Sequence, residues 1–338
     1  MGVKQPLGSP ILEVQGLHKR FGSVQAVAQV DFTVAQGELF GFLGPNGAGK
    51  TTTINMLTGL ARPDGGSVRI AGIDCIAKPR AAQHLIGVVP DESNLYPELS
   101  GFDNLCFCAA LYGLDRRERQ LRARQLLDQF GLSAAADRKF SQYSKGMKRK
   151  LTIAAGIIHR PPILFLDEPT TGIDVASARQ VREKIADLHR QGTTIFLTTH
   201  YIEEAERLCQ RIAFIVAGRI VRCATLSALL EPLRQRHQLL ISCTLSDRVV
   251  MAKLARHLAV AFPALQVQAG AAGQIRLEGE QPIAVGPLVR LIEAQGGEVF
   301  EARRLQPNLE EVFLQITGLD AQALQGEAAG RGRRGGQA

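Results

Sequence analysis

Short apolar runs separated by polar turns divide this chain into strands and helices. Residues 11–17 and 24–34 predict two strands joined by a turn, and Leu39-Phe-Gly-Phe-Leu43 predicts a third strand with no polar residue. Ile163-Leu-Phe-Leu166 and residues 193–199 form two more apolar strands, and each ends at a charged or polar residue. Strands of this kind belong in the middle of a parallel sheet covered on both faces. The pattern therefore predicts an α/β fold.

The rest of the chain follows two other patterns. Residues 98–159 are predicted to be helical, with leucines on their apolar faces. From residue 239 the order becomes strand, helix, two strands, helix, strand and a short last helix at 309–316, which is typical of a small ferredoxin-like α+β domain. We expect a first domain over residues 1–228, a linker over 229–238, the α+β domain over 239–318, and a disordered Gly/Arg-rich tail over 319–338.

Composition excludes several classes of protein. The 338 residues are 45% hydrophobic and 21% charged, which is typical of a soluble globular chain with about two domains. The apolar runs are much shorter than the roughly 20 residues of a membrane span, and the first ten residues lack an apolar signal region, so we expect a cytoplasmic location. The six scattered cysteines form no C-x-x-C pair, and Cys106 and Cys108 lie in an apolar stretch, so we expect buried free thiols. The net charge of +8 is compatible with nucleic acid or with an anionic membrane surface.

A glycine-rich segment between the third strand and a helix carries the strongest chemical signal. It fits the pattern G-x-x-x-x-G-K-[ST], in which glycines let the backbone curl so that successive N–H groups face a phosphate. The following helix adds partial positive charge at its N-terminus. The lysine would reach the β- and γ-phosphates, and the next hydroxyl would ligate Mg²⁺. The segment comprises Gly44, Pro45, Asn46, Gly47, Ala48, Gly49, Lys50, Thr51 and Thr52.

Three polar side chains follow the apolar strands. Asp167 and Glu168 come directly after one strand, and His200 follows another. Because ligands bind at the carboxyl ends of parallel strands, these three side chains are expected to converge on one site. Successive strand side chains point in opposite directions, so one carboxylate can serve a metal while the other faces an attacking water.

Two weaker candidates have ordinary structural interpretations. Ser144 begins a helix as its N-cap, with Gly146 close by, which is a possible anion site but also a common structural cap. Phe21 lies in a turn, and taken alone it predicts core packing.

Over about residues 10–228 the chain resembles the ATP-binding-cassette (ABC) transporter ATPases. Five motifs occur in the family's order. They are the glycine-rich segment, Tyr143-Ser-Lys-Gly-Met147, Ile163-Leu-Phe-Leu-Asp-Glu-Pro169, Thr171-Gly-Ile-Asp174, and His200. The ending at residues 305–318 looks like that of the drug and polysaccharide exporter branch, which is a looser match. The resemblance implies a P-loop NTPase cassette with a mainly parallel core sheet, antiparallel strands and a helical subdomain over about residues 92–159.

The resemblance also implies a role for each matching residue. Lys50 and Thr51 would hold the phosphates and Mg²⁺ of ATP, Asp167 would hold Mg²⁺ through water, and Glu168 would be the general base. His200 would touch the γ-phosphate, and Phe21 would stack on adenine, which reverses its interpretation as a core residue. Ser144 and Gly146 would meet the ATP bound to a second copy in a head-to-tail dimer, with Asp174 at the seam.

The resemblance implies a location and partners as well. The helical subdomain would receive an integral membrane permease subunit at the cytoplasmic face of the cell membrane. The membrane subunit would select the transported substrate, so the sequence of this chain does not identify it.

The chain departs from the family pattern at a few positions. Asp91 stands where the family usually has a glutamine that contacts Mg²⁺; an aspartate can also ligate Mg²⁺, but it is shorter and charged. Lys145 and Met147 replace the more familiar glycine and glutamine of the motif around Ser144.

The function that this pattern favours is the ATP-hydrolysing subunit of an exporter of a drug, lipid or polysaccharide-like substrate. One alternative is a soluble ABC ATPase that acts on ribosomes or nucleic acid, as the charge suggests. The chain lacks the second cassette or coiled-coil insertion of such proteins, so no nucleic acid partner is expected. A non-hydrolysing regulator is a third possibility, and Glu168 argues against it.

Overall fold

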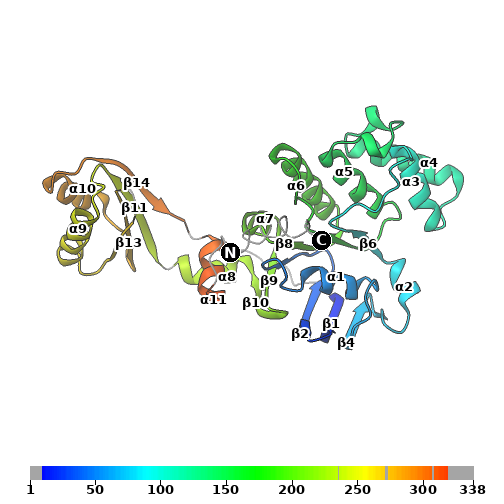
Figure 1. Cartoon of the computed structure of the whole chain (residues 1–338), viewed down its shortest axis with the longest axis horizontal. Helices are drawn as coiled ribbons and strands as arrows, with labels where there is room; N and C mark the ends of the chain where they lie inside the picture. The colour runs from blue at the N-terminus through cyan, green and yellow to red at the C-terminus, as the bar shows by residue number, and fades with distance from the viewer. Residues whose placement is uncertain (1–9, 235, 271–272, 307, 319–338) are drawn as a thin grey trace, which may run out of the picture. The chain divides into compact units, whose positions relative to one another are not determined.

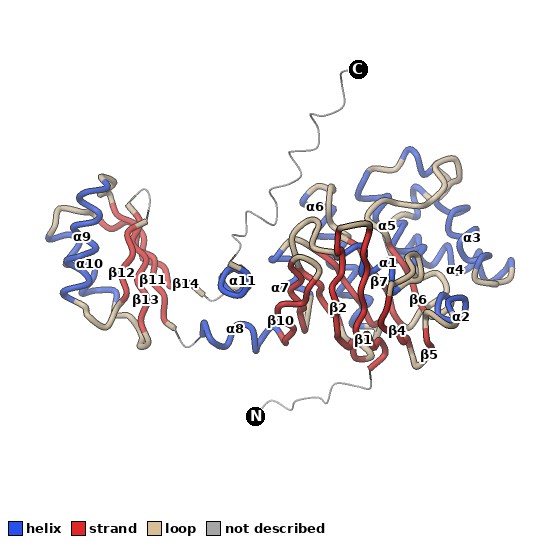
Figure 2. Tube along the Cα trace, turned by 60° about the horizontal axis from the view of Figure 1, so that its bottom comes forward, coloured by secondary structure: helices blue, strands red, loops and turns tan. Residues whose placement is uncertain are grey.

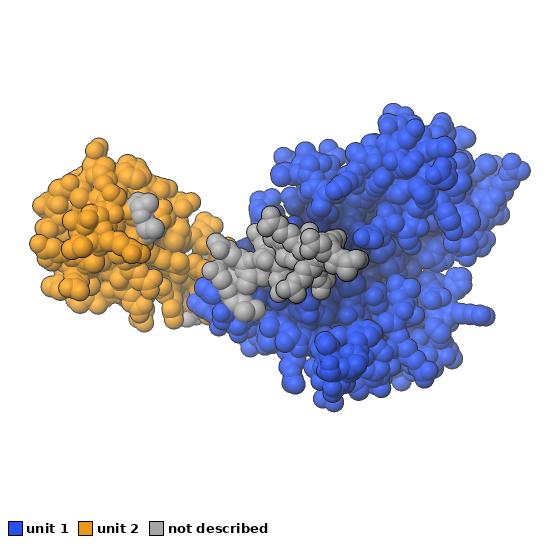
Figure 3. All heavy atoms as spheres, viewed as in Figure 1, with its two compact units in different colours: residues 1–226, 313–338 blue, residues 227–312 orange. Residues whose placement is uncertain are grey.

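The structure is a computed structural model that describes residues 10–234, 236–270, 273–306 and 308–318. The chain forms two compact units, one of residues 1–226 with 313–338 and the other of residues 227–312 (Figure 3). The predicted tail, 319–338, lies outside the described residues. The first unit contains two sheets and the second unit one, and each unit has its own hydrophobic core.

A six-stranded sheet forms the centre of the first unit. Its strand order is β10-β9-β3-β8-β7-β6, and every neighbouring pair is parallel except β9 with β10. All residues of β3, β7 and β8 are buried, as their apolar sequences predicted. The strands are β3 Leu39–Leu43, β6 Ile86–Val89, β7 Ile163–Asp167, β8 Thr194–Thr199, β9 Arg211–Val216 and β10 Arg219–Thr225.

A second, antiparallel sheet packs against the first and covers part of the core. Its order is β2-β1-β4-β5, from β1 Pro10–Phe21, β2 Val24–Ala35, β4 Gly65–Ile70 and β5 Ile73–Asp74 (Figure 2). Phe32 of β2 meets Phe40, Phe42 and Phe196 of the large sheet, with ring centroids 5.6 to 5.8 Å apart. The two sheets are therefore joined through an aromatic cluster, whose burial stabilises the unit.

Helices cover the remaining faces of the first unit. They are α1 Lys50–Leu57, α2 Pro79–Gln83, α6 Val175–Arg190 and α7 Ile202–Leu208 around the sheet, and α3 Gly101–Leu111, α4 Arg116–Gln129 and α5 Lys145–Gly156 in a separate block (Figure 1). Ser100, Asp115 and Ser144 cap α3, α4 and α5 with side-chain oxygens that accept N–H bonds. Two 3-10 turns interrupt the block at Ser133–Ala135 and Phe140–Gln142. The helical character predicted for residues 98–159 is confirmed over α3, α4 and α5, whereas residues 130–144 form turns and the two 3-10 segments.

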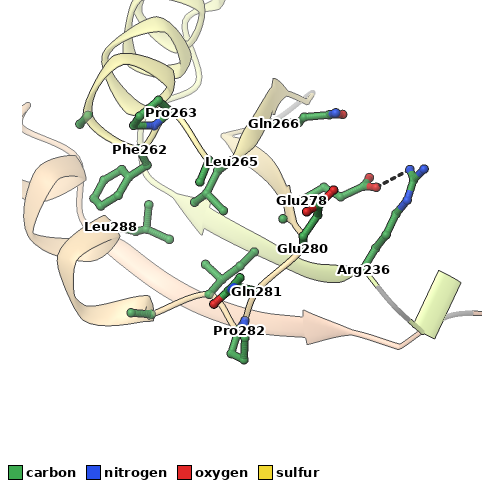
Figure 4. Close-up of a pocket in the computed structure, with 15 residues that line it drawn as sticks. Arg236, Phe262, Pro263, Leu265, Gln266, Glu278, Glu280, Gln281, Pro282 and Leu288 are labelled. Atoms are coloured by element: carbon green, nitrogen blue, oxygen red, sulfur yellow. Dashed lines mark hydrogen bonds and ion pairs between the residues drawn. The ribbon is translucent and has the colours of Figure 1, made fainter.

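The second unit has the predicted strand and helix order. It contains β11 His237–Cys243, α9 Arg248–Ala261, β12 Gln266–Ala269, β13 Gln274–Gly279, α10 Val285–Ala294 and β14 Val299–Leu305. The strands form an antiparallel sheet in the order β12-β13-β11-β14, with α9 and α10 packed through leucines on its core. A hollow of about 730 Å³ opens between the end of α9, the end of β13 and the start of α10. Phe262, Leu265 and Leu288 lie on its apolar side, across from the Arg236–Glu278 ion pair (Figure 4).

Some of the remaining segments differ from the structure that the sequence predicts. Residues 229–238, predicted as a linker, lie largely in α8 Leu226–Arg234, because Leu229, Leu230 and Leu233 form a buried helical stripe. The last helix is α11 Leu309–Thr317. No helix among the described residues has the length and apolar character needed to cross a bilayer. All six cysteines are free; three are buried, and Cys223 is exposed.

The contact between β6 and α5 predicts one effect on stability. A Cβ atom at Gly87 would lie 2.2 Å from the carbonyl oxygen of Gly156, at the end of α5. The backbone of α5 cannot move aside as easily as a flexible side chain, so Gly87→Ala should lower the free energy of unfolding by about 1–3 kcal/mol.

The matched control is Gly286→Ala in α10. Its Cβ would approach only the end of the Arg290 side chain, and alanine favours the helix.

Urea unfolding followed by circular dichroism measures both variants. A Gly87→Ala protein as stable as the wild type would contradict the close packing of α5 on β6.

Candidate active site

The glycine-rich segment forms a tight loop between β3 and α1. Gly47 and Gly49 have φ values of 79° and 103°, in the left-handed region that favours glycine. Gly44 is buried, and a Cβ there would lie 2.2 Å from the Ile215 carbonyl oxygen. Ala48 is also buried, whereas Asn46 and Gly47 are exposed at the tip of the loop. The backbone therefore has the curled shape that the sequence pattern predicted.

The β1–β2 hairpin lies beside this loop. A Cβ at Gly49 would lie 2.4 Å from the Ala26 carbonyl oxygen in β2. Phe21, at the end of β1, leaves 54% of its side chain exposed, so its interpretation as a core residue is wrong. The reason is its position, because Phe21 lies at the end of the hairpin, beyond the part of the strands that packs on the core. An exposed ring of this kind is free to stack on a planar ligand.

Lys50 is buried at the start of α1 and points back into the loop. Its Nζ donates to the carbonyl oxygens of Gly44 and Pro45, at 2.9 and 3.1 Å, and forms an ion pair with Glu168 Oε1 at 3.0 Å. Thr51, the next residue, is exposed. A buried ammonium group facing a curled loop can bind an anionic oxygen as a point charge.

The ends of β7 and β8 bring the predicted carboxylates and histidine together. Asp167 is buried at the end of β7, and Thr198 of β8 donates a short hydrogen bond to its Oδ1. His200 Nδ1 lies 2.9 Å from Glu168 Oε2. The parallel register that pairs Asp167 with Thr198 explains why side chains over thirty positions apart in the sequence meet here.

Glu168 is the most constrained of these residues. Its φ is 46°, an uncommon left-handed conformation for a residue with a side chain, and its backbone N–H donates to the Thr198 carbonyl. Thr171 Oγ1 donates to Glu168 Oε2 at 3.1 Å. Burial would raise the pKa of Glu168, but the hydrogen bond from His200 and the charge of Lys50 outweigh it and lower the pKa to about 2. The carboxylate is therefore held ionised and in a fixed orientation.

Asp91 lies beside this cluster on the loop that follows β6. Its carboxylate is about half exposed, and its Oδ1 lies 3.4 Å from Arg149 Nη2. Burial raises the pKa of Asp91, the charge of Arg149 lowers it, and Glu168 and Asp167 raise it further.

Sequence reasoning did not identify Arg149 or Thr198. Arg149 stands between two other basic residues in the sequence, so nothing in the pattern marks it as the buried one of the three. Thr198 carried no distinguishing signal, because it is one of three threonines in β8.

Ser144, Gly146 and Asp174 form a second group at the adjoining ends of α5 and α6. Ser144 Oγ accepts from the Met147 N–H at 3.2 Å, and Asp174 Oδ1 accepts from the Ser177 N–H at 2.9 Å. A Cβ at Gly146 would lie 2.2 Å from Ser177 Oγ, so the glycine permits the two helix ends to meet. Ser144 and Asp174 are both exposed, as is the apolar Val175. These contacts belong to the helix ends and involve none of the loop residues.

Comparison with known proteins gives consistent matches. The family model for ABC transporters matches residues 27–171. The daunorubicin resistance ATP-binding protein DrrA3 of Streptomyces coeruleorubidus is 36% identical over 315 residues, with 91% of this chain and 96% of the relative covered. The linearmycin resistance ATP-binding protein LnrL of Bacillus subtilis (strain 168) is 34% identical over 313 residues, with 91% and 98% covered.

Solved structures agree with this match. One described as the ATP-binding subunit of an ABC transporter has a TM-score of 0.61 at 31% identity and covers 66% of this chain and 93% of its own. A second, a dimeric ATP-binding cassette in a post-hydrolysis state bound to ADP and Pi, has a TM-score of 0.59 at 26% identity and covers 64% of this chain and 98% of its own.

The low pKa of Glu168 predicts a dependence of stability on pH. The native pKa is about 2 and the ordinary value is 4.5, so the ionised group stabilises the fold above about pH 4.5 and loses this effect as the pH falls toward 2. The difference in free energy of unfolding between wild type and Glu168→Gln should therefore shrink by roughly 3 kcal/mol across this window.

Urea unfolding at pH values between about 6 and 2 measures the difference. Glu203→Gln is the matched control, since Glu203 is an exposed acid on α7 and its replacement should give a small, nearly pH-independent difference. A difference that stays constant for Glu168→Gln would show that Lys50 and His200 do not hold this carboxylate.

Proposed function

This chain belongs to the ABC transporter family of ATP-binding proteins, and we propose that two copies of it hydrolyse ATP between them to energise export through separate membrane subunits. The chain is an ATPase subunit of this family. The observation that carries the proposal is the cluster of Lys50, Glu168 and His200 at the ends of three strands. It combines a phosphate-binding cation with a fixed carboxylate, which is what hydrolysis of a bound phosphate requires.

ATP would bind with its phosphates on the loop between β3 and α1. The inward N–H groups of the loop and the start of α1 would face the phosphate oxygens, and Lys50 would reach the β- and γ-phosphates. The exposed ring of Phe21 would stack on the adenine. Thr52 would add a hydroxyl at the first turn of the helix.

The residues at the site also fit Mg²⁺. Within the described residues no group of three or more His, Cys, Asp or Glu is arranged to hold a metal alone, but Mg²⁺ bound with a nucleotide needs only one or two protein oxygens beside phosphate and water. Exposed Thr51 and the carboxylate of Asp167 would provide these, whereas Asp91, predicted from the sequence as a further ligand, is paired with Arg149. The ion would neutralise charge that develops on the phosphates during transfer.

Glu168 would act as the general base for the attacking water. At a pKa of about 2 the carboxylate is a weak proton acceptor, because His200 and Lys50 both stabilise its charge. When Lys50 turns to the phosphate oxygens, one of these two interactions is lost and Glu168 becomes a stronger base. His200 would then keep the carboxylate oriented and contact the γ-phosphate.

A second copy of the chain would complete the site. Ser144 is exposed at the N-terminal end of α5, where a capped helix can face an anion on another chain, and Gly146 follows it, buried against Ser177. Asp174 and Val175 are exposed beside them and would lie at the seam. The dimeric, ADP-bound cassette among the similar solved structures supports this arrangement.

The helical block would receive a membrane subunit at the cytoplasmic face of the cell membrane. Leu111 on α3 is largely exposed, and Tyr96 and Phe107 are partly exposed with their rings edge to face at 5.0 Å. Phe107 and Leu111 lie on α3, and Tyr96 lies in the segment before it; exposed apolar groups of this kind are typical of a surface that contacts another protein. The relatives named for drug resistance favour export over the alternative, a soluble ATPase that acts on ribosomes or nucleic acid.

Removing the base should separate hydrolysis from ATP binding. Glu168→Gln should lower the ATPase rate by about 100-fold or more, because the amide cannot accept the proton of the attacking water. The variant should still bind ATP and elute as a dimer in size-exclusion chromatography with ATP and Mg²⁺.

The control adds Ser144→Arg to Glu168→Gln, which should return the protein to a monomer because the large cation crowds the seam. Undiminished hydrolysis by Glu168→Gln would remove Glu168 from the role of base.

The membrane partner can be sought by affinity purification from detergent-solubilised membranes of cells that express the tagged chain. A protein with several membrane spans should be recovered with the wild type and lost with Leu111→Glu, which places a charge on the apolar face of α3. Val260→Glu on α9 is the control, since Val260 is also exposed, and it should leave recovery unchanged. Recovery of ribosomes or nucleic acid instead would overturn the export function.

A further inference from the structure

Arg149 is a buried cation that joins three parts of the active site. It lies on α5 with only 7% of its side chain exposed. Its Nη1 donates to the Pro90 carbonyl at 2.6 Å, and its Nη2 donates to the Asp91 carbonyl at 2.6 Å. Nη2 also lies 3.4 Å from the carbonyl oxygen of Glu168. One guanidinium therefore holds the loop after β6 and the backbone of Glu168 together.

The chemistry of this contact requires arginine. Arginine presents several donors in a rigid planar fork, whereas a lysine would offer one compact ammonium group without the fixed geometry of the fork. A buried cation also needs a counter-charge, because an unpaired one is costly to remove from water. Asp91 supplies that charge, with its Oδ1 3.4 Å from Arg149 Nη2.

Helix α5 connects this contact to the other end of the site. The helix begins at its cap, Ser144, and Arg149 lies little more than one turn further along. Thr152 on the same helix makes a second tie to the loop after β6, through a 2.8 Å hydrogen bond to Ser93 Oγ. A displacement of α5 is therefore carried to both the loop and the backbone of Glu168.

We propose that Arg149 is a positioning residue that transmits the position of α5 to the catalytic carboxylate of Glu168, and that Asp91 is its counter-ion. This inference rests on the proposed function, since it takes Glu168 as the base. It assigns Asp91 to the protein framework, in contrast to the Mg²⁺ ligand that the sequence suggested. It also gives the helix that carries Ser144 a direct mechanical connection to the hydrolytic step.

Arg149→Gln tests the proposal through steady-state ATPase kinetics. Loss of the fork should misplace Glu168 and lower kcat by about 100-fold, as a displacement of about 1 Å can do. KM for ATP should stay within about twofold, because Lys50 and the phosphate loop are untouched. Lys150→Gln is the matched control, since Lys150 is the next residue on α5, bonds only an exposed glutamine side chain, and should leave kcat unchanged.

Arg149→Lys addresses the risk that the glutamine variant does not fold. It keeps the positive charge beside Asp91 but loses the fork, so its Tm should stay close to that of the wild type while kcat still falls. A wild-type kcat in a folded Arg149→Lys or Arg149→Gln protein would overturn the proposal.

Asp91→Asn separates the two roles of Asp91. If Asp91 acts through Arg149, the double variant Asp91→Asn/Arg149→Gln should have the same kcat as Arg149→Gln alone, and the Mg²⁺ concentration for half-maximal activity should not change. An additive loss in the double variant, with a raised Mg²⁺ requirement in Asp91→Asn, would assign Asp91 to the metal and overturn its role as counter-ion. If the Glu168→Gln variant retains hydrolysis, the proposed function fails. If Glu168→Gln is inactive and Arg149→Gln keeps the wild-type kcat, the inference about Arg149 fails and the proposed function stands.

Discussion

The buried ion pair between Lys50 and Glu168 is the contact on which the arrangement of the active site depends. It joins the phosphate loop after β3 to the end of β7, two strands that are separated in the sheet by β8. Removing two charges from water is costly, so such a pair persists only when other hydrogen bonds complete it. The carbonyls of Gly44 and Pro45 serve the lysine, and His200 and Thr171 serve the carboxylate. Breaking the pair leaves a buried charge unless another ion replaces the lost partner, and a phosphate group is such an ion for Lys50.

The same constraint explains why the site is divided between two places in the chain. The loop and the carboxylates belong to the core sheet, whose carboxyl edge is fixed by apolar strands. Ser144 and Gly146 belong to the end of α5, in a helical block that packs on the sheet through Gly87 and Gly156. Arg149 is a buried polar connection between them, beside the Thr152–Ser93 hydrogen bond. Under the proposed function, a movement of the helical block can then reach the carboxylate of Glu168 without rearranging the phosphate loop.

The sequence predicted most of this fold because its patterns are local. The apolar strands at Leu39–Leu43 and Ile163–Asp167 and the glycine-rich loop each depend on neighbouring residues, and the structure has them where the pattern indicated. The convergence of Glu168 and His200 followed from the rule for parallel strands. The assignment of ligands to the site residues stays a prediction.

The sequence could not predict contacts between elements that are far apart along the chain. Nothing near Arg149 distinguishes it from the lysines on either side, because its burial depends on a loop almost sixty residues away. Phe21 was read as a core residue from its type alone, whereas its exposure follows from its place at the hairpin end. Residues 229–238 are predicted as a linker, whereas most of them belong to the helix Leu226–Arg234, in which Pro232 is tolerated.

The central claim, that one ATP site is built from two chains, can be tested by mixing two inactive variants. Lys50→Ala removes the phosphate cation, and Ser144→Ala removes the hydroxyl of the facing helix end without adding bulk at the seam, so each protein alone should have a strongly reduced ATPase rate. In a mixed dimer, the intact loop of the Ser144→Ala chain would meet the intact Ser144 of the Lys50→Ala chain, and one complete site would form. The account predicts that mixing restores a substantial fraction of the ATPase rate. A mixture as inactive as its two components would contradict it.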